Sequence, residues 1–197
     1  MYYMKKEFLF YKINIYIIIN MDLKKYIDKI KSIPFSGGNI LDIVDGESKI
    51  VRYPDLHKYN KIEEVLKPYN CFFLLYETKP KYGHWVCVIL HPNNILEFFD
   101  PYGYFIDDEL NFIDNNFRKK TFQEYPFLSR LFLNSPYKIE WNKMKLQKKY
   151  KNNSSCGRHI ALRMALRDLS LKQYQELMKN QNGIDSDDKV TLLTAFI

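Results

Sequence analysis

The chain has 197 residues, of which 46% are hydrophobic and 27% are charged. These values exclude an intrinsically disordered chain and predict one domain whose core is large enough to need no cross-links. Three cysteines, Cys71, Cys87 and Cys156, are an odd number without close pairing, which argues against a disulfide framework and favours a reducing compartment. The net charge of +7 indicates attraction to polyanions.

The first twenty residues do not match a membrane span. The apolar run at residues 8–19 is interrupted by Lys12 and Asn14, and it is shorter than the roughly 20 residues that a spanning helix needs. It also lacks the small-residue cleavage site of a signal peptide. Met21 opens a better-formed segment. We therefore expect residues 1–20 to be an extension that need not belong to the mature protein, residues 21–197 to form the folded domain, and no membrane association.

Helical periodicity begins after this extension. Residues 22–33 place apolar side chains at helical spacing with lysines on the other face, and the proline and glycines of residues 34–38 end the predicted helix. Residues 39–59 are mixed and predict loops with a short helix or strand. Asn60 is predicted to cap a short helix through Lys67 that carries two glutamates in its first turn, where the helix dipole favours acids.

Three apolar runs of strand length follow, at residues 71–76, 84–90 and 95–99. The last two are joined by His91-Pro92-Asn93-Asn94, a composition typical of a hairpin turn. Runs this apolar predict strands that are covered on both faces. The remaining predicted elements are helices at 107–117 and 121–133, a strand at 137–141, a buried helix at 156–169 and a C-terminal helical portion broken at Asn182-Gly183. The predicted fold class is α+β with one domain.

A cysteine at the start of a predicted helix is the main chemical feature. The polar residues 152–155 lead into Cys156 and Gly157, which open the buried helix. Only a thiolate is a strong nucleophile, and the unpaired N–H groups at a helix N-terminus stabilise an anion. Gly157 is expected to let a substrate approach the backbone closely. The alternative is a buried structural cysteine, which the polar loop before Cys156 disfavours.

Of the four histidines, His84 is the best candidate for a general base. It opens a predicted strand between Gly83 and Trp85, and Asp100 ends the next strand of the hairpin. In an antiparallel pair the start of one strand lies beside the end of the next. We therefore expect the Asp100 carboxylate to orient the His84 ring and to stabilise its charged form.

The alternatives to this pair are specific. His159 lies one helical turn after Cys156, but we expect no carboxylate from a separate strand to hold it. His57 and His91 are expected at the surface. For Asp100, the alternative is an aspartate that forms the turn at Pro101-Tyr102-Gly103.

Acyl transfer also needs hydrogen-bond donors for an oxyanion. The candidates are the backbone N–H of Cys156 and the side-chain amide of Gln147, with Asn152 and Asn153 as alternatives.

A zinc site is the alternative to this interpretation. His84, Cys87, His91 and Cys71 are zinc-type ligands. However, His84 and Cys87 are three positions apart on one strand and point to opposite faces. We expect no metal, and we expect Cys71 and Cys87 to be core thiols.

The basic charge is concentrated in residues 137–151, which hold six lysines and one acid, Glu140; Arg118-Lys119-Lys120 is a second cluster. One interpretation is a solvated basic surface, and the other is a DNA-contact face beside the site. The candidate contacts are Lys143, Lys145, Lys148, Lys149 and Lys151.

Four motifs occur in the order His84-Trp85, Asp100-Pro101-Tyr102-Gly103, Gln147 and Cys156-Gly157. In this order they resemble the adenain and ubiquitin-like-protein-protease superfamily of cysteine peptidases, over roughly residues 70–170. The resemblance implies a single-domain papain-like or adenain-like α+β fold, in which helices flank a central mixed sheet and the nucleophile opens a buried helix. It implies a Cys-His-Asp triad in which Cys156 is the nucleophile, His84 the base and Asp100 its orienter. Gln147 would be the oxyanion donor, and Trp85 and Gly157 would line the substrate cleft.

The small size and the bias toward residues with AT-rich codons resemble most the capsid-maturation proteases of adenoviruses, large DNA viruses and virophages. This implies a monomeric endopeptidase that cleaves viral capsid or core precursors at glycine-rich sites, in the virion and the host cytoplasm (viral factory). No cofactor would be required. Relatives can be activated by DNA or a peptide, which would give the lysine-rich stretch a role. The nine-residue step from Gln147 to Cys156 is longer than in the family.

Two other functions fit the same motifs. One is a deubiquitinase or SUMO-type protease that acts after Gly-Gly. The other is a catalytically silent protein that binds DNA or capsid and uses the same fold.

Overall fold

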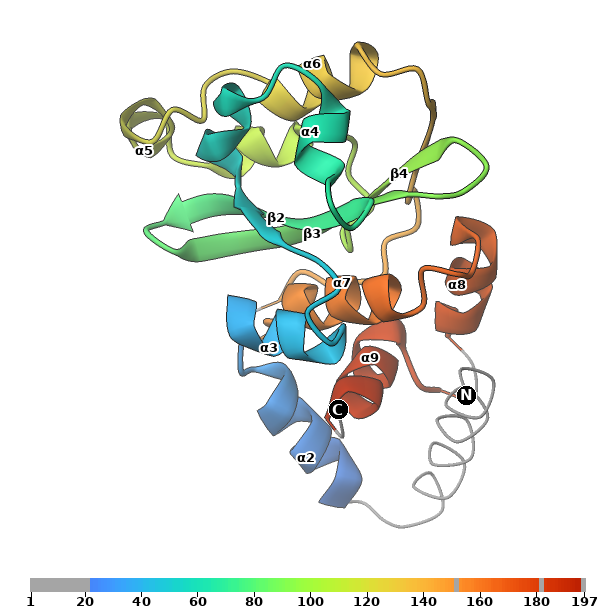
Figure 1. Ribbon diagram of the computed structural model, residues 1–197. Helices are drawn as coiled ribbons and strands as arrows, with labels where there is room; N and C mark the ends of the chain where they lie inside the picture. The colour runs from blue at the N-terminus through green and yellow to red at the C-terminus, as the bar shows by residue number, and fades with distance from the viewer. Residues whose placement is uncertain (1–21, 151–152, 181–182, 196–197) are drawn as a thin grey trace.

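The computed structural model describes residues 22–150, 153–180 and 183–195. The expected N-terminal extension, Asn152 and Lys151 lie outside these ranges. A mixed sheet occupies the middle of the domain, with helices above and below it and a further helical layer beneath (Figure 1). The expected α+β class, with one mixed sheet flanked by helices, is therefore confirmed.

The sheet has five strands in the order β1-β2-β3-β4-β5. The strands are β1 (Ile50–Arg52), β2 (Cys71–Lys79), β3 (Tyr82–Leu90), β4 (Ile95–Phe99) and β5 (Lys138–Trp141). The three central strands are antiparallel, whereas β1 runs parallel to β2 and β5 runs parallel to β4. All four predicted strands are present. The β2–β3 hairpin is longer than the apolar runs at 71–76 and 84–90, because β2 continues to Lys79 and β3 begins at Tyr82.

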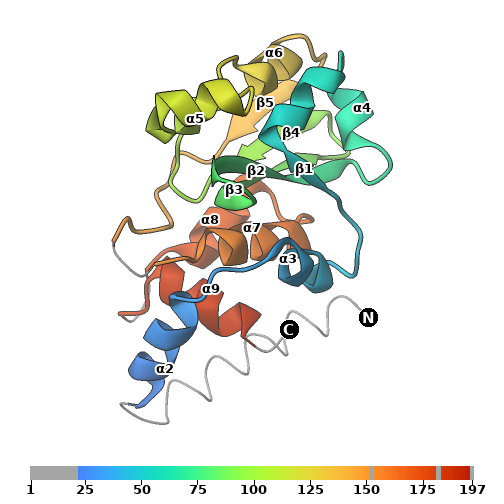
Figure 2. The ribbon, with the colours of Figure 1, turned by 90° about the vertical axis from the view of Figure 1, so that its left-hand side faces the viewer.

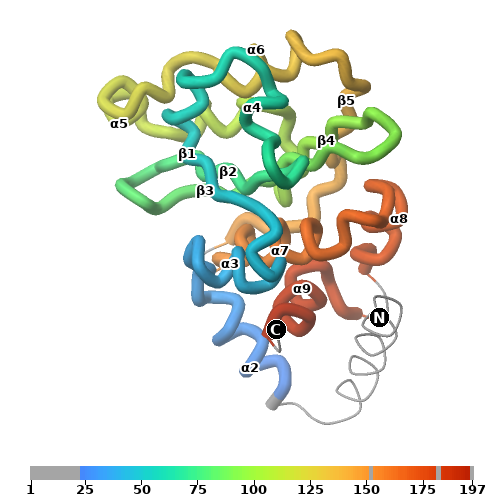
Figure 3. The backbone as a smooth tube through the Cα atoms, in the orientation of Figure 1, coloured from blue at the N-terminus to red at the C-terminus, as the bar shows by residue number. Residues whose placement is uncertain are grey.

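One group of helices covers the upper face of the sheet in Figure 1. It consists of the 3-10 helices η1 (Tyr53–Lys58) and η2 (Asp108–Phe112) and the α-helices α4 (Ile62–Leu66), α5 (Asn115–Lys120) and α6 (Phe127–Leu133). The chain then returns along β5 to the opposite face, as the tube in Figure 3 shows.

The opposite face carries a second group of helices. It consists of α3 (Gly37–Ile43), α7 (Cys156–Ala165) and α8 (Leu171–Met178), with α2 (Asp22–Lys31) and α9 (Ser186–Thr194) beyond α7. Helix α7 packs across β3, α3 and α9 both contact α7, and α2 contacts α9 (Figure 2). Helix α7 is therefore enclosed between the sheet and an outer helical layer.

The alternation of side chains along the strands explains why the apolar runs are continuous. Phe73 and Cys87 point into the core on the α7 side, while Phe72 and Val88 point into the core beneath α4 and α6. All four side chains are buried, and burying a large apolar side chain contributes roughly 1.5–3 kcal/mol. The predicted coverage of both faces is confirmed. Burial raises the pKa of the Cys71 and Cys87 thiols above the ordinary value, as expected for core thiols.

Three predicted helices are shorter than expected, for local backbone reasons. The predicted helix at 107–117 divides into η2 and α5, and Asp107 stands before η2 in the left-handed region with φ 66°. The predicted helix at 121–133 forms only in its second half, because Phe122 has φ 56° and Pro126 follows it. Helix α7 ends at Ala165 rather than at residue 169.

The predicted cap at Asn60 was wrong by one residue. Lys61 is the N-cap of α4, and the Glu64 carboxylate accepts hydrogen bonds from the backbone N–H groups of Asn60 and Lys61. The predicted C-terminal break lies between α8 and α9, where Gly183 has φ 79°. Within the described ranges, no helix combines the length and the apolarity that crossing a bilayer demands.

Candidate active site

Cys156 is the first residue of α7, and its side chain is only partly buried. The rest of the helix is enclosed, from Gly157 to Met164. A ten-residue helix leaves its first N–H groups without intrahelical partners, and these groups favour an anion at the position of the sulfur. The expected placement of Cys156 at the start of a buried helix is therefore confirmed.

His84 and Asp100 are in direct contact. The Nε2 atom of His84 donates to Oδ1 of Asp100 at 2.9 Å, and Asp100 is fully buried. The pairing of Cys87 with Phe99 in the β3–β4 hairpin brings the start of one strand beside the end of the other. Asp100 Oδ1 also accepts from the backbone N–H of Tyr102 at 2.7 Å. The same carboxylate thus forms the turn and holds the ring, so both interpretations of Asp100 apply.

His84 and Cys156 line the same cavity, and Cys156 is one of the groups that raise the pKa of the ring. Because Nε2 is bonded to Asp100, Nδ1 is the nitrogen left for the sulfur. Burial disfavours the charged ring, but the charges of Asp100 and Glu109 and the hydrogen bonds to Asp100 and Cys156 raise the pKa of His84 well above its ordinary value. Tyr102 stacks on the ring at a centroid distance of 4.6 Å and fixes its plane.

Glu109 is a second carboxylate beside His84 that the sequence did not reveal. Its Oε1 lies 3.9 Å from His84 Nε2 and has no hydrogen-bond partner. Burial raises the pKa of Glu109, the positive charges of His84 and Lys149 lower it, and the Asp100 charge raises it further. In the sequence, Glu109 follows two other acids and has the pattern of a solvated turn, so no signal distinguished it.

Gln147 lies next to the turn that carries Asp100. Its backbone N–H donates to the carbonyl of Pro101 at 2.9 Å, and its side chain is 1% exposed with Oε1 unpartnered. The alternative donor Asn153 is engaged elsewhere, because its Nδ2 donates to the Lys148 carbonyl at 2.7 Å and to Asp187 at 3.0 Å. Of the two, Gln147 is the better placed to donate to a ligand.

A cavity of about 730 Å³ unites these groups. It is lined by Cys156, His84, Gln147, Glu109 and Trp85, among others. Of the predicted side chains, His84, Trp85, Gln147 and Cys156 therefore open into one space that could hold an extended peptide, while Asp100 lies buried behind His84.

A protein of the Sputnik virophage, "Uncharacterized protein V9", is 38% identical to this chain over 173 residues, which cover 86% of this chain and 97% of that protein. The chain belongs to the V9 family. No family model matches the chain.

Solved structures similar to this V9-family chain include two crystal structures of the ASFV pS273R protease. They have TM-scores of 0.45 and 0.38 at 12% identity, and the matches cover 83% and 75% of this chain and 67% and 57% of those chains. ChlaDub1 from Chlamydia trachomatis matches with a TM-score of 0.29 at 16% identity, over 91% of this chain and 76% of its own. Likeness at this level is weak, so the chemistry of the V9-family site rests on its own geometry.

Gly157 was expected to line the substrate cleft, but the structure gives it a packing role instead. Gly157 is buried, and a Cβ atom there would lie 2.8 Å from Cβ of Phe35, 3.4 Å from Ile40 and 3.6 Å from Trp85. In the V9-family chain the glycine allows the segment before α3 to pack on α7. Trp85, in contrast, lines the cavity as expected.

Most of the candidate DNA-contact lysines of the lysine-rich stretch interact with other residues of the chain. Lys148 pairs with Asp185 at 2.7 Å, and Lys143 lies over the Trp141 ring at 4.2 Å. Lys149 lies over the rings of Tyr102, Tyr104 and Phe112 at 4.2–4.6 Å. Lys145 is exposed. Three of the four described candidate lysines of the V9-family chain thus have intramolecular partners, and of these three Lys149 lines the cavity. DNA contact stays a prediction.

The other histidines lie elsewhere. His159 Nε2 contacts Asp187 Oδ1 at 3.0 Å, so a carboxylate does hold this ring, but it comes from helix α9 and not from a separate strand. His159 is fully buried and is not among the residues that line the cavity. His91 was expected at the surface but is partly buried, and it bonds to Glu97 at 2.9 Å. His57 is exposed as expected.

Among the described residues, one group has the atoms to ligate a metal ion. His84, Asp100 and Glu109 place one ligand-type atom each within 4.8 Å of one another. Binding of an ion there would compete with the hydrogen bond from His84 to Asp100, so this group overlaps the candidate catalytic residues.

Proposed function

We propose that this V9-family protein is a cysteine endopeptidase that cleaves viral capsid or core precursor proteins at glycine-rich sites during virion maturation. The observation that carries the proposal is the position of the His84 ring between Asp100 and the cavity that Cys156 lines. The ring donates to the buried Asp100, and it lines the same cavity as Cys156, which is large enough for a peptide. Thiol hydrolases need this combination of nucleophile, base and orienting acid.

In the proposed reaction, His84 and Cys156 form an imidazolium–thiolate pair. The sulfur attacks the carbonyl carbon of the scissile bond, and the imidazolium then gives its proton to the leaving amine. The departing amine leaves a thioester on Cys156. A water molecule, deprotonated by His84, hydrolyses this thioester and releases the second product. Asp100 keeps the ring oriented through both steps.

The negative oxygen of each tetrahedral intermediate needs donors. We assign this role to the backbone N–H of Cys156 at the start of α7 and to the side-chain amide of Gln147, both of which border the cavity. Removal of one such donor costs roughly 100- to 1,000-fold in kcat in related chemistry.

The preference for glycine-rich sites is supported by the cavity lining. Phe35, Tyr82 and Trp85 all contribute large aromatic side chains to it, which favours substrate residues without side chains. Membership of a virophage protein family supports a viral precursor as the substrate and the virion and host viral factory as the place of action. We propose that the protein acts as a monomer without a cofactor.

The test is cleavage of virion precursor proteins from the source virus, followed by mass spectrometry of the products. The wild-type protein and Cys156→Ala are incubated in parallel, and a Gly-Gly-linked ubiquitin-like reporter is included. Precursor cleavage at glycine-rich sites that requires Cys156 is the expected result. Rapid reporter cleavage with untouched precursors would instead identify a deubiquitinase or SUMO-type protease, and no cleavage of either would favour the silent binding protein.

A further inference from the structure

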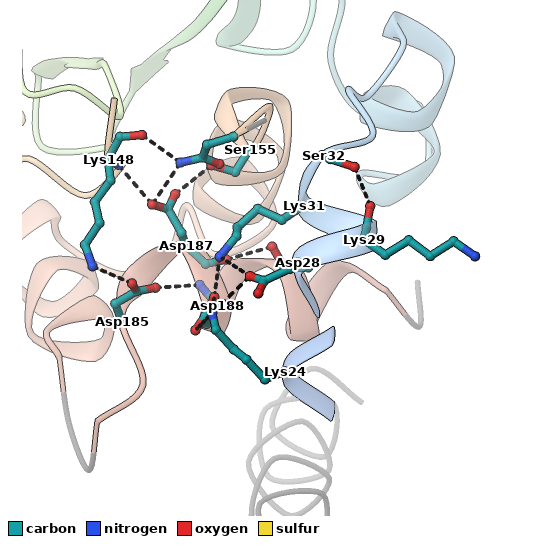
Figure 4. Close-up of polar contacts among 12 residues, drawn as sticks. Lys24, Asp28, Lys29, Lys31, Ser32, Lys148, Ser155, Asp185, Asp187 and Asp188 are labelled. Atoms are coloured by element: carbon teal, nitrogen blue, oxygen red, sulfur yellow. Dashed lines mark hydrogen bonds and ion pairs between the residues drawn. The ribbon is translucent and has the colours of Figure 1, made fainter. Parts of the chain in front are cut away.

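The first turn of α9 holds residues that are adjacent in sequence to both of the proposed oxyanion donors, Gln147 and Cys156. Asp187, in this turn, is fully buried and accepts four hydrogen bonds. Its Oδ1 accepts from Ser155 Oγ at 2.6 Å and from His159 Nε2 at 3.0 Å. Its Oδ2 accepts from the Lys148 backbone N–H at 2.9 Å and from Asn153 Nδ2 at 3.0 Å (Figure 4).

Two of these four donors stand next to the proposed catalytic residues. Lys148 directly follows Gln147, and Ser155 directly precedes Cys156. A single carboxylate therefore ties the two ends of the loop 148–155 together, immediately beside the groups that would face the oxyanion. We propose that Asp187 is a positioning residue that sets the separation between the Gln147 amide and the Cys156 N–H group. This inference rests on the proposed function.

The surrounding contacts make the turn a rigid support. Ser186 Oγ donates to the carbonyl of Leu146, so α9 holds the residue on each side of Gln147. Asp188 accepts from the buried Lys31 at 2.6 Å, and the Lys31 carbonyl accepts from Ser154 N–H at 3.0 Å. Figure 4 shows Asp188 directed at Lys31 and Asp187 directed at Lys148 and Ser155. Within the longer Gln147–Cys156 step, Lys148, Asn153, Ser154 and Ser155 are thereby held by contacts outside the segment.

The charge of Asp187 matches this arrangement. Burial favours the neutral acid, but hydrogen bonds from His159, Ser155 and Lys148 together with the His159 charge lower the pKa of Asp187. An ionised carboxylate accepts at both oxygens, whereas an asparagine presents one oxygen and an NH₂ group that donates. In Asp187→Asn, the NH₂ group replaces one carboxylate oxygen and faces the two donors that this oxygen accepted from. The substitution therefore breaks about half of the four hydrogen bonds without a change in side-chain size.

The experiment compares two reactions of Cys156 that differ in their need for an oxyanion hole. Acylation by p-nitrophenyl acetate passes through a tetrahedral oxyanion, which collapses to the acetyl thioester and p-nitrophenolate. The absorbance of the released nitrophenolate measures the rate. Alkylation by iodoacetamide needs the thiolate but forms no oxyanion. For Asp187→Asn we expect acylation to slow about tenfold or more, as misplaced groups cost up to about 100-fold, and the alkylation rate to remain unchanged.

Two further variants make the test specific. In a Gln147→Ala background, Asp187→Asn should cause little additional loss of acylation, because residues that act through one another are not additive. Asp185→Asn is the matched control. It lies on the same turn, pairs with the Lys148 side chain at the surface, and keeps a capping oxygen for α9, so acylation should be unchanged. Should Asp187→Asn fail to fold, Ser155→Ala removes one of the four donors and should give a smaller loss of the same kind.

The outcomes separate the two proposals. Unchanged acylation in Asp187→Asn, or equal losses of acylation and alkylation, would overturn the positioning role and leave the proposed function in place. Full additivity with Gln147→Ala would also overturn it, because the effect would not pass through Gln147. A wild-type protein that p-nitrophenyl acetate acylates no faster than Cys156→Ala would instead remove the proposed function itself.

Discussion

His84 and Asp100 lie sixteen residues apart in the sequence and 2.9 Å apart in space, with Nε2 of the ring donating to Oδ1 of the carboxylate. The hairpin of β3 and β4 produces this contact, because its register brings the start of one strand to the end of the next. The turn that follows β4 adds a second constraint through the Tyr102 N–H group, which donates to the same oxygen. The hairpin and the turn thus position the carboxylate, and the carboxylate and the stacked Tyr102 ring hold the His84 ring.

The first prediction concerns the nucleophile. Cys156→Ala should reduce proteolysis of the virion precursors to background, because no other thiol of the described residues borders the cavity. The fold should be unaffected, since the side chain is only partly buried and alanine is an excellent helix former. Circular dichroism and product analysis check the two parts. Precursor cleavage that persists in this variant would mean that Cys156 is not the nucleophile.

The second prediction compares the base with its orienter. His84→Ala should lower kcat/KM about a thousandfold. Asp100→Asn should cost less, about tenfold to a hundredfold, because misorienting a base costs less than deleting it and Glu109 still faces the ring. Asp114→Asn, at the exposed N-cap of α5, is the matched control and should change nothing. Equal and negligible losses in His84→Ala and Asp100→Asn would contradict the triad.

The third prediction concerns the second carboxylate, Glu109. The pKa of Glu109 is raised in the folded state, so its charged form destabilises the fold. This destabilisation is absent at acid pH, and it grows as the pH rises above the pKa of an unfolded glutamate. Glu109→Gln should therefore be more stable than wild type at neutral pH, by on the order of 1 kcal/mol. At a pH below about 4, where unfolded glutamate is also protonated, the two proteins should have the same stability. Denaturant unfolding at both pH values checks this.

The same variant should also change the pH dependence of proteolysis. Glu109 is one of the charges that raise the pKa of His84. With the glutamate neutralised, the ring loses its proton at a lower pH, so the alkaline limit of kcat should move to lower pH. An alkaline limit identical to that of wild type would show that Glu109 does not act on His84.

The sequence predicted where the candidate site residues lie in the fold, because each position is encoded locally. A polar loop before Cys156, an apolar run that begins at His84 and an apolar run that ends just before Asp100 are short-range patterns, and the hairpin register follows from a short turn. Membership of the V9 family was not among the predictions, although the resemblance pointed to viral proteins.

Other residues could not be recognised because their partners are distant. Asp187 and His159 meet only when α9 packs against α7, and Glu109 reaches His84 only through the 3-10 turn of η2. Gly157 was misassigned for a similar reason, since Phe35, which packs over it, comes from more than a hundred residues earlier. Local patterns thus define which side chains are available, and helix packing determines what they touch.

The fourth prediction concerns the lysine-rich stretch. If it binds DNA, the affinity for duplex DNA should fall steeply with added salt, with a log–log slope of about −0.9 for each phosphate that the protein neutralises. The double substitution Lys143→Ala and Lys145→Ala should make this slope shallower by about 1 for each of the two lysines that reaches a phosphate. Lys58→Ala, in a surface pair with Asp55 on η1, is the control. Salt-independent binding, or none, would leave the stretch as a solvated surface.

The measurement that tests the central claim most directly is the rate at which iodoacetamide modifies each cysteine at neutral pH, located by peptide mapping. An ordinary thiol is only a few per cent ionised at this pH, and Cys71 and Cys87 are buried with raised pKa values. Cys156 should therefore react first, and His84→Ala should slow its modification about tenfold or more. Equal rates for Cys156 in wild type and His84→Ala would contradict an imidazolium–thiolate pair at this site.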